Sequence, residues 1–434
     1  MYWKQIFNER NDSPHWDWHV VMYFINVFLV VFGYSLRGGA FQAVKAFRTA
    51  LVVVALLALM LTVKQVKFYF HRQKNWVLWV FVGLILLVAP FSVNLFWSAG
   101  RLGAWLPFLI YSNYFVVHLF SNYTKDEALF KLLQIFNLVY AYPLGVMIFY
   151  GVVFQTENIY GQDIGSFKAN VLGWACTVFV LTGFDLYANR PMSVWLRYTF
   201  FGVAFLALWG IVLTGSRSSY LSLAAATMVL VVRNQRISVY LKLFVGLCIV
   251  AFAYYIITSP DSVVNLRAQY ADIRQQRGEI RFKLADQAFG AMLKNPHLLF
   301  TGFGFDNFRE GLERYAGIRT ELASHNSYLE VFFSSGVLVF LFFMAFMVGN
   351  ALLKYSRFDS RLFVFFPMPM IVPYFESNLN AGQFLFFPWM TFMFFYVHVS
   401  SVQQPLKESK PKEKSDELSA FKTNNSPLFR DSTQ

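Results

Sequence analysis

The residues able to do chemistry concentrate in one polar stretch, residues 259–327, which lies between long apolar segments. This stretch ends in Ser324-His325-Asn326-Ser327. A neutral imidazole such as that of His325 can take a proton from a hydroxyl at ordinary pH. Ser324 and Asn326 are also good helix-capping residues, so the alternative role for His325 is a hydrogen bond at a helix start. Because the stretch is too long for a simple connection, we interpret it as the chemical site.

Three arginines of the same stretch, Arg274, Arg277 and Arg281, are spaced three and four residues apart. On a helix, this spacing places all three guanidinium groups on one face. Three cations on one stripe repel each other, which is explained if an anion binds there. The planar guanidinium donates two hydrogen bonds to phosphate oxygens, so the stripe predicts a phosphate site. The alternative is a solvated helix face that nearby carboxylates partly neutralise.

Four further charged residues lie near the same face of the predicted membrane domain. Arg217 stands in Leu213-Thr214-Gly215-Ser216-Arg217-Ser218-Ser219, a polar break between two apolar segments, where an arginine is costly unless it faces a partner or a cavity. Arg37 and Arg101 are either supporting cations or anchors at the membrane interface. Glu376 either orients His325 or an arginine, or is solvated.

The composition is that of a membrane protein. Hydrophobic residues make up 57% of the 434 residues and charged residues only 14%, and apolar runs recur with lengths that suit membrane-spanning helices. The formal charge of +13 does not indicate a nucleic-acid partner, because most Lys and Arg residues lie in short connections between apolar runs. The two cysteines fall inside apolar runs, so the sequence predicts neither a disulfide framework nor a cysteine metal site.

We therefore predict an all-α, polytopic integral membrane protein with about twelve transmembrane helices and one large extracytoplasmic loop. The predicted spans are about 20–36, 43–63, 76–97, 102–120, 133–154, 170–188, 194–213, 218–232, 239–258, 328–349, 361–375 and 384–399.

The distribution of Lys and Arg predicts the orientation. Both termini are expected in the cytoplasm and the 259–327 loop outside it. The chain then divides into residues 1–258 with about nine spans, the outer loop 259–327, residues 328–400 with about three spans, and a cytoplasmic tail 401–434 that is too polar to fold. The first 19 residues are polar and no cleavage site follows the first apolar run, so we expect that run to stay in the protein.

Neither a metal nor a cofactor is expected. The sequence contains no Asp-x-Asp pair of the kind that holds a divalent cation in many transferases. Asn295-Pro296 and Gly302-Phe303-Gly304 indicate turns, since their glycines do not follow the dinucleotide-binding spacing.

Four short motifs resemble those of the O-antigen ligase and polymerase superfamily, and they follow one another along the chain in the family's order. One motif consists of His325-Asn326 followed by nine residues and Gly336, and it resembles the His-[Asn/Ser/Gln]-x9-Gly pattern of O-antigen ligases. Thr214-Gly215-Ser216-Arg217 is similar to the family's Thr-x-Ser-Arg segment. The stretch from Arg281 to Phe308 and the stretch from Gly165-Ser166-Phe167 to Asn170 are similar to two further family segments. The motifs cover roughly residues 160 to 340.

The resemblance implies a bacterial inner-membrane transferase whose active site faces away from the cytoplasm. Its donor would be a glycan on undecaprenyl pyrophosphate and its acceptor a sugar hydroxyl, with the lipid bilayer and other polysaccharide assembly proteins as further expected partners. In our hypothesis His325 is the base, while Arg217 with Arg277 or Arg281 binds the pyrophosphate and stabilises its developing charge. Composition favours a repeat-unit polymerase for O-antigen, capsule or exopolysaccharide, with a ligase that transfers the polymer to lipid A core as the close alternative.

Two other classes fit less well. A transporter or flippase for lipid-linked sugars would also need many spans and a cationic cavity, but it would more often carry charges at mid-membrane depth in two repeated halves. A cell-wall glycosyltransferase of similar shape would rely on an aspartate of the outer loop. The candidates for that residue are Asp261, Asp272, Asp286 and Asp306.

Overall fold

The computed structural model describes residues 16–36, 38–62, 76–153, 169–188, 194–214, 216–233, 238–258, 272–320, 326–349 and 386–398. Within these ranges the chain is helical and contains no strand, which confirms the predicted all-α membrane class. Four of these helices are long and apolar enough to cross a membrane, and several shorter apolar helices accompany them. The four are Gly39–Leu61, Leu95–Asn122, Asp126–Phe149 and Ser327–Ala345.

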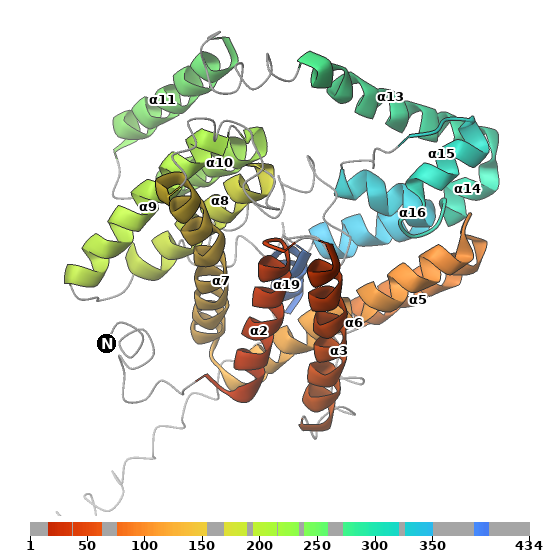
Figure 1. Ribbon diagram of the computed structural model, residues 1–434, viewed down its shortest axis with the longest axis horizontal. Helices are drawn as coiled ribbons and strands as arrows, with labels where there is room; N and C mark the ends of the chain where they lie inside the picture. Colours follow the sequence, from red (N-terminus) through yellow and green to blue (C-terminus); the bar gives the residue numbers. More distant parts are fainter. Residues whose placement is uncertain are drawn as a thin grey trace, which may run out of the picture.

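The centre of the molecule is a bundle in which α6 and α7 are the longest helices. Helices α2 and α3 pack on one another, α3 also packs on α6, and α2 on α7, while α19 packs on α6 (Figure 1). A large apolar core fills the bundle, with Trp105, Tyr23 and Phe115 fully buried. The bounds are α2 Trp18–Gly33, α3 Gly38–Thr62, α5 Trp76–Val88, α6 Leu95–Asn122, α7 Lys125–Val153 and α19 Phe386–His398.

A second group of helices continues from α7. Helix α8 packs against α7, α9 and α10, and α10 packs against α11 (Figure 1). These helices are α8 Ala169–Ala188, α9 Val194–Thr214, α10 Arg217–Arg233 and α11 Val239–Thr258.

The described part of the 259–327 loop folds into helices that pack on the last long membrane helix. Helices α13, α14 and α15 lie beside α16, at the opposite side of the bundle from α9 (Figure 1). They share an apolar core of their own, which includes Met292, Phe303, Leu312 and Phe333. The bounds are α13 Asp272–Lys294, α14 Pro296–Thr301, α15 Phe308–Ala316 and α16 Ser327–Phe342, followed by a π-helical turn, Phe343–Val348.

The predicted boundary between the third and fourth spans is wrong. Helix α5 ends at Val88, a short 3-10 turn covers Ala89–Phe91, and α6 begins at Leu95, whereas one span was expected to continue to residue 97. Pro90 has no N–H to continue the α5 ladder, and the Asn94 side chain accepts a hydrogen bond from Trp97 N at 3.1 Å, which starts the next helix. The predicted span 361–375 lies outside the described residues.

Candidate functional site

Helix α16 begins immediately after the predicted catalytic histidine. Asn326 is its N-cap, and the Asn326 side-chain oxygen accepts hydrogen bonds from the backbone N–H groups of Tyr328 and Leu329, both at 3.0 Å. The Asn326 side chain thus satisfies two of the backbone N–H groups at the start of α16 that have no partner within the helix. The capping role foreseen for Asn326 is therefore confirmed, and the helix start next to position 325 in the sequence is fixed.

Ten residues further on, Gly336 interrupts α16. Its φ of 77° and ψ of −179° lie outside the helical region, so the carbonyls before it are released from the helix ladder. The turn at Gly302-Phe303-Gly304 uses two of them: Phe303 N donates to Phe333 O at 2.6 Å and Gly304 N to Ser334 O at 3.1 Å. The outer loop is thereby bonded through its backbone to the middle of α16.

A third segment joins this crossing from the α5–α6 connection. Val93 N donates to Phe303 O at 2.8 Å, and a side chain at Gly304, whose φ is 99°, would collide with Ser92. Residues 92–93, 302–304 and 333–336 therefore form one crossing of three backbones, which we call the glycine crossing. It confirms that the Gly302-Phe303-Gly304 motif is a turn and shows which two segments the turn connects.

Side chains extend the crossing onto the first turns of α6. Arg101 Nε lies 2.9 Å from Asp306 Oδ2, and its guanidinium stacks over the Trp97 ring at 4.4 Å. The Trp97 indole donates to Asp306 O at 3.2 Å, and Asn307 Nδ2 donates to Ser98 Oγ at 2.9 Å. Arg101 is therefore engaged in holding the outer loop on α6.

The Asp306 carboxyl is held in an unfavourable environment. Burial raises the pKa of Asp306 above its ordinary value, an effect that Arg101 opposes and Glu310 adds to. Asp306 also adopts a φ of 59°, in the left-handed region. Among the aspartates considered for a cell-wall glycosyltransferase, Asp306 is thus an ion-pair partner, while Asp286 is exposed and Asp261 lies outside the described residues.

The Thr-Gly-Ser-Arg motif forms the junction between α9 and α10. Thr214 ends α9 and Arg217 begins α10, with Ser216 O accepting from Ser219 N and Tyr220 N, both at 3.1 Å. The hydroxyl groups of the motif lie on Gly173 of α8, where an added Cβ would come within 2.8 Å of Thr214, Ser216 and Ser219.

Hydrogen bonds complete this junction. Ser219 Oγ donates to Ser216 Oγ at 2.8 Å, and the Trp174 indole donates to Ser218 Oγ at 2.6 Å. All these hydroxyls are buried. The motif therefore has a structural part, which fixes where α10 begins, and Arg217 is the first residue of that helix.

Helix α13 carries the three arginines of the predicted phosphate stripe. It runs from Asp272 to Lys294, so Arg274, Arg277 and Arg281 do lie on one helix at the spacing that places them on one face. Helix α13 packs on α14 and α15, and α14 packs on α16. The structure thus packs the arginine helix into one apolar core with α14, α15 and α16, the helix that Asn326 caps, while Arg217 belongs to the α8–α10 group.

Three predicted site residues, His325, Arg37 and Glu376, lie outside the described residues. Sequence reasoning also missed residues that hold helices or segments together in the structure. Gly173 and Trp174 carried no signal, because nothing in a helical sequence announces which residue meets a hydroxyl cluster. The Asp306–Arg101 pair joins residues of two distant segments, so the sequence could not predict it. The neighbouring glycines Gly302 and Gly304 indicated only that the backbone turns near Asp306.

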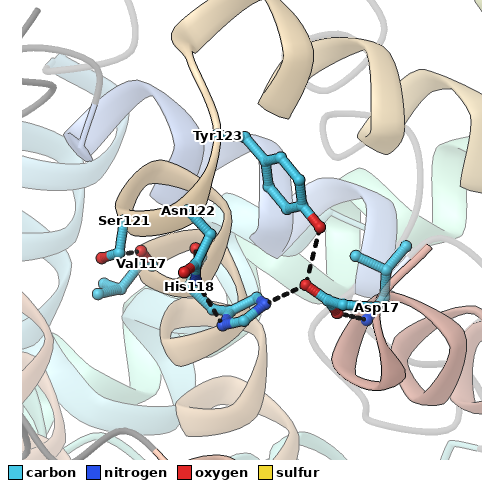
Figure 2. A network of polar contacts seen from close by, with 7 residues as sticks. Asp17, Val117, His118, Ser121, Asn122 and Tyr123 are labelled. Atoms are coloured by element: carbon cyan, nitrogen blue, oxygen red, sulfur yellow. Dashed lines mark hydrogen bonds and ion pairs between the residues drawn. The ribbon is translucent and has the colours of Figure 1, made fainter. Parts of the chain in front are cut away.

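A second polar network lies at the other end of α6 (Figure 2). His118 Nε2 lies 2.7 Å from Asp17 Oδ2, and the Tyr123 hydroxyl donates to the same oxygen at 2.8 Å (Figure 2). Asn122 Nδ2 lies 3.0 Å from His118 Nδ1, so both ring nitrogens of His118 have polar neighbours. Asp17 Oδ1 meanwhile accepts from Val20 N at 2.9 Å and caps α2.

This network favours an ionised Asp17. Burial alone would raise the pKa of Asp17, but the hydrogen bonds from His118, Val20 N and Tyr123, together with the electrostatic attraction of His118, outweigh it and bring the pKa well below its ordinary value. The pKa of Tyr123 is raised by burial and by its bond to Asp17. The network ties the start of α2 to the end of α6, which is a structural role.

The Arg101–Asp306 network and the His118–Asp17 network lie at opposite ends of α6. Arg101 lies in its second turn and His118 in its last two turns, within a helix of 28 residues that is about 42 Å long at 1.5 Å per residue. The segments that the charge pattern assigns to one side, residues 92–101 and 302–307, meet at one end. Asp17, assigned to the other side, meets the opposite end.

These observations define a polytopic all-α membrane protein in which the helices α13, α14 and α15 pack on the long helix α16 or on one another. A family model described as O-antigen ligase matches residues 202–344. The matched segment contains Arg217, the arginines of α13, His325 and Gly336, so the resemblance to the O-antigen ligase and polymerase superfamily is confirmed. This family indicates a glycosyltransferase-type ligase or polymerase, a multi-pass protein of the bacterial inner membrane, with lipid-linked glycan substrates. No match was found among curated proteins.

Proposed function

We propose that this protein transfers a glycan from undecaprenyl pyrophosphate to the hydroxyl of an acceptor sugar, at the outer face of the inner membrane. The observation that carries the proposal is the family match over residues 202–344, because it includes Arg217, the arginines of α13 and the histidine motif. The packing of α13, α14 and α16 around one core supports it, since arginines and the histidine motif then belong to one unit.

In the proposed reaction the acceptor oxygen attacks the anomeric carbon of the donor glycan. The bond from that carbon to the pyrophosphate oxygen breaks, and the pyrophosphate lipid leaves with the electron pair. His325 takes the proton of the acceptor hydroxyl, a contribution of about 10² to 10⁴ in rate for a positioned base. Arg217 together with Arg277 or Arg281 stabilises the charge that develops on the leaving pyrophosphate.

The remaining predicted residues have supporting roles. Asn326 fixes the helix start beside His325 through its two backbone hydrogen bonds. Arg101 holds the outer loop through Asp306. Arg37 and Glu376 are proposed to complete the charge balance of the site, with Glu376 orienting the histidine or an arginine. Arg274 is proposed to bind the pyrophosphate with the other two arginines of α13.

The acceptor separates a polymerase from a ligase. We favour a polymerase that extends the repeat units of O-antigen, capsule or exopolysaccharide on the carrier. A ligase, which the family description itself names, is the second candidate and would transfer the finished polymer to lipid A core.

The test is complementation of cells that lack this protein, with the surface glycan resolved on a gel. His325→Ala should abolish transfer, and His297→Ala is the matched control, because His297 is an exposed histidine of the same loop. Single repeat units without a ladder would identify a polymerase, and long chains on the carrier with none on lipid A would identify a ligase. A glycan unchanged in His325→Ala cells would overturn the transferase assignment and favour a transporter of lipid-linked sugars.

A further inference from the structure

An arginine without a counter-ion lies inside the membrane bundle. Arg48 is in the third turn of α3 and is only 5% exposed. Its guanidinium carbon lies 4.9 Å above the ring of Phe108 on α6, and its Nε has no hydrogen-bond partner within the described part of the chain. A buried cation that pairs with nothing is expensive, so such a residue inside a membrane indicates a functional site.

The helices around Arg48 supply positive charge and no carboxylate. Helices α2, α3 and α6 pack together, and their sequences contain neither Asp nor Glu. Lys45, one turn before Arg48, is half-buried and close enough to interact electrostatically with Arg48, Arg101 and Asp306. Asp306 is already engaged with Arg101 at 2.9 Å. Within the described part of the chain, Arg48 therefore has no acidic partner, and Lys45 shares Asp306 with Arg101, so positive charge is in excess on this face of α3.

The chemistry of this pair selects the anion. Arginine and lysine bind phosphate oxygens through charge-assisted hydrogen bonds, arginine through two at once. The opposite face of α3 is exposed and apolar, with Phe47 at 60%, Val54 at 58% and Leu61 at 80% exposure. A helix with such a surface borders the lipid, where the available anions are those carried on an acyl or prenyl chain.

We propose that Lys45 and Arg48 bind the phosphate group of an anionic lipid at the wall formed by α2, α3 and α6. Lys45 meets the phosphate first, because it is nearer the start of α3 and less buried, and Arg48 receives it from behind. Two sources share this chemistry, an acidic phospholipid of the bilayer and a polyprenyl phosphate. The site does not depend on the transferase proposal, since binding requires neither His325 nor the arginines of α13.

The test uses the full-length protein, purified in nonionic detergent and freed of lipid. Native mass spectrometry would measure binding of short-chain phosphatidylglycerol, with phosphatidylcholine of the same chain length as the uncharged comparison. We expect Arg48→Gln and Lys45→Gln each to weaken phosphatidylglycerol binding by about tenfold or more, since each removes hydrogen bonds to a charged group. Arg319→Gln is the control, because Arg319 is an exposed arginine paired with Glu313.

A stability measurement separates a binding role from a packing role. Without lipid, Arg48→Gln should unfold at the same or a higher temperature than the wild type, because it removes a buried charge that has no partner. With phosphatidylglycerol the order should reverse. Destabilisation of Arg48→Gln to the same extent with and without lipid would show that Arg48 only packs, and would overturn the proposal.

Competition identifies the source of the phosphate. Displacement of phosphatidylglycerol by undecaprenyl phosphate would assign the site to a polyprenyl carrier, and persistence of phosphatidylglycerol would assign it to a bilayer phospholipid. Equal binding of phosphatidylglycerol and phosphatidylcholine, or equal binding by wild type and both variants, would overturn the site. His325→Ala should bind as wild type does, so a failure of the transferase proposal leaves this measurement intact.

Discussion

Gly302 and Gly336 lie at the point where the 259–327 loop crosses α16. Backbone atoms of α16 contact Gly302, and backbone atoms of the loop contact Gly336. A Cβ on Gly302 would meet the backbone of Ser334 and Ser335, and a Cβ on Gly336 would meet the backbone of Leu299 and Phe300. Both residues have a positive φ, 68° and 77°. Two separate constraints, the backbone angle and the close approach, therefore require glycine at both positions.

Gly302→Ala and Gly336→Ala should each be severely destabilising. Their ψ angles of −171° and −179° place both residues in a backbone region that is essentially restricted to glycine, which costs another residue about 1–3 kcal/mol, and forcing a methyl group into a closed contact adds about 1–3 kcal/mol. Thermal unfolding of the purified protein would measure the loss. Gly317→Ala is the control, because Gly317 lies in the milder left-handed helical region, with φ 69° and ψ 20°, and has no neighbour within 4 Å, so a smaller conformational cost remains and no clash is added. An equal loss in all three variants would contradict the crossing.

The sequence predicted the elements of this crossing without predicting the crossing itself. Gly302 and Gly304 indicated a turn, and Gly336 was recognised as part of a family pattern. Local backbone preference is visible in a sequence, but the pairing of residues 303 and 333 depends on how α14 and α16 pack. For the same reason the apolar runs predicted most membrane helices, while the break at Ser92–Asn94 was missed. Its backbone groups Val93 N and Asn94 O bond to the distant residues Phe303 and Asn307, which the sequence does not reveal.

Gly173→Ala should disrupt the junction between α8 and α10. The added methyl group would lie 2.8 Å from Thr214, Ser216 and Ser219, so the hydroxyl cluster must move or the helices must separate. We expect a loss of about 1–3 kcal/mol, the usual cost of overpacking a closed core. Gly202→Ala on α9 is the control, because nothing lies within 4 Å of its Cβ position. If the two variants unfold at the same temperature, α8 and α10 do not pack this tightly.

Arg101 and Asp306 should show a measurable and pH-dependent coupling. Their side chains are both 28% exposed, and a double-mutant cycle with Arg101→Gln and Asp306→Asn should give about 1 kcal/mol at pH 8. Burial raises the pKa of Asp306, so the folded state binds its proton at a higher pH than the unfolded chain does. The coupling should therefore be lost as pH falls through this raised pKa, before the ordinary aspartate range near 4.

The same shift has a consequence for overall stability. Because ionised Asp306 is disfavoured in the fold, the wild type should gain stability relative to Asp306→Asn as pH falls through the raised pKa. Guanidinium unfolding of both proteins across this range would measure the difference. A stability difference that does not change with pH would show that Asp306 is not held in a buried environment.

Asp17→Asn should have the opposite dependence on pH. The pKa of Asp17 is lowered in the fold, so its stabilisation is complete above the unfolded pKa near 4 and disappears as pH falls toward the folded value. At neutral pH the variant should lose about 1–3 kcal/mol, the range for hydrogen bonds to a charged group. Asp126→Asn is the control, since Asp126 is exposed at the start of α7. A wild-type advantage that persists unchanged at pH 3 would exclude the ionised carboxylate as its source.

The Asp17 network also shows the limit of the sequence reasoning about histidines. The rings of His19 and His118 lie close together, with centroids 4.7 Å apart. The distribution of Lys and Arg gave no sign that Asp17, 101 residues from His118, would be the partner of His118. A carboxylate before one span and a histidine at the end of another become neighbours only when α2 and α6 are placed side by side.

The arginine stripe of α13 should act as one unit in transfer. Arg277→Gln and Arg281→Gln should each lower kcat/KM by about 10² or more, and the double variant should lose less than the product, because both would stabilise the same leaving pyrophosphate. Lys283→Gln is the matched control: it removes one positive charge from the same helix, at an exposed position off the stripe. A loss of the same size in Lys283→Gln would mean that general positive charge, and not the stripe, attracts the donor.

Chelation completes this test, because guanidinium groups and a divalent cation are alternative ways to neutralise a pyrophosphate. If Arg277 and Arg281 supply the charge, transfer by the wild type should continue unchanged in excess EDTA. The paired measurement is the effect of added Mg²⁺ on Arg281→Gln. Inhibition of the wild type by EDTA, reversed by Mg²⁺, would show that a metal takes the role assigned here to the arginines, and the stripe would then bind the donor without carrying the chemistry.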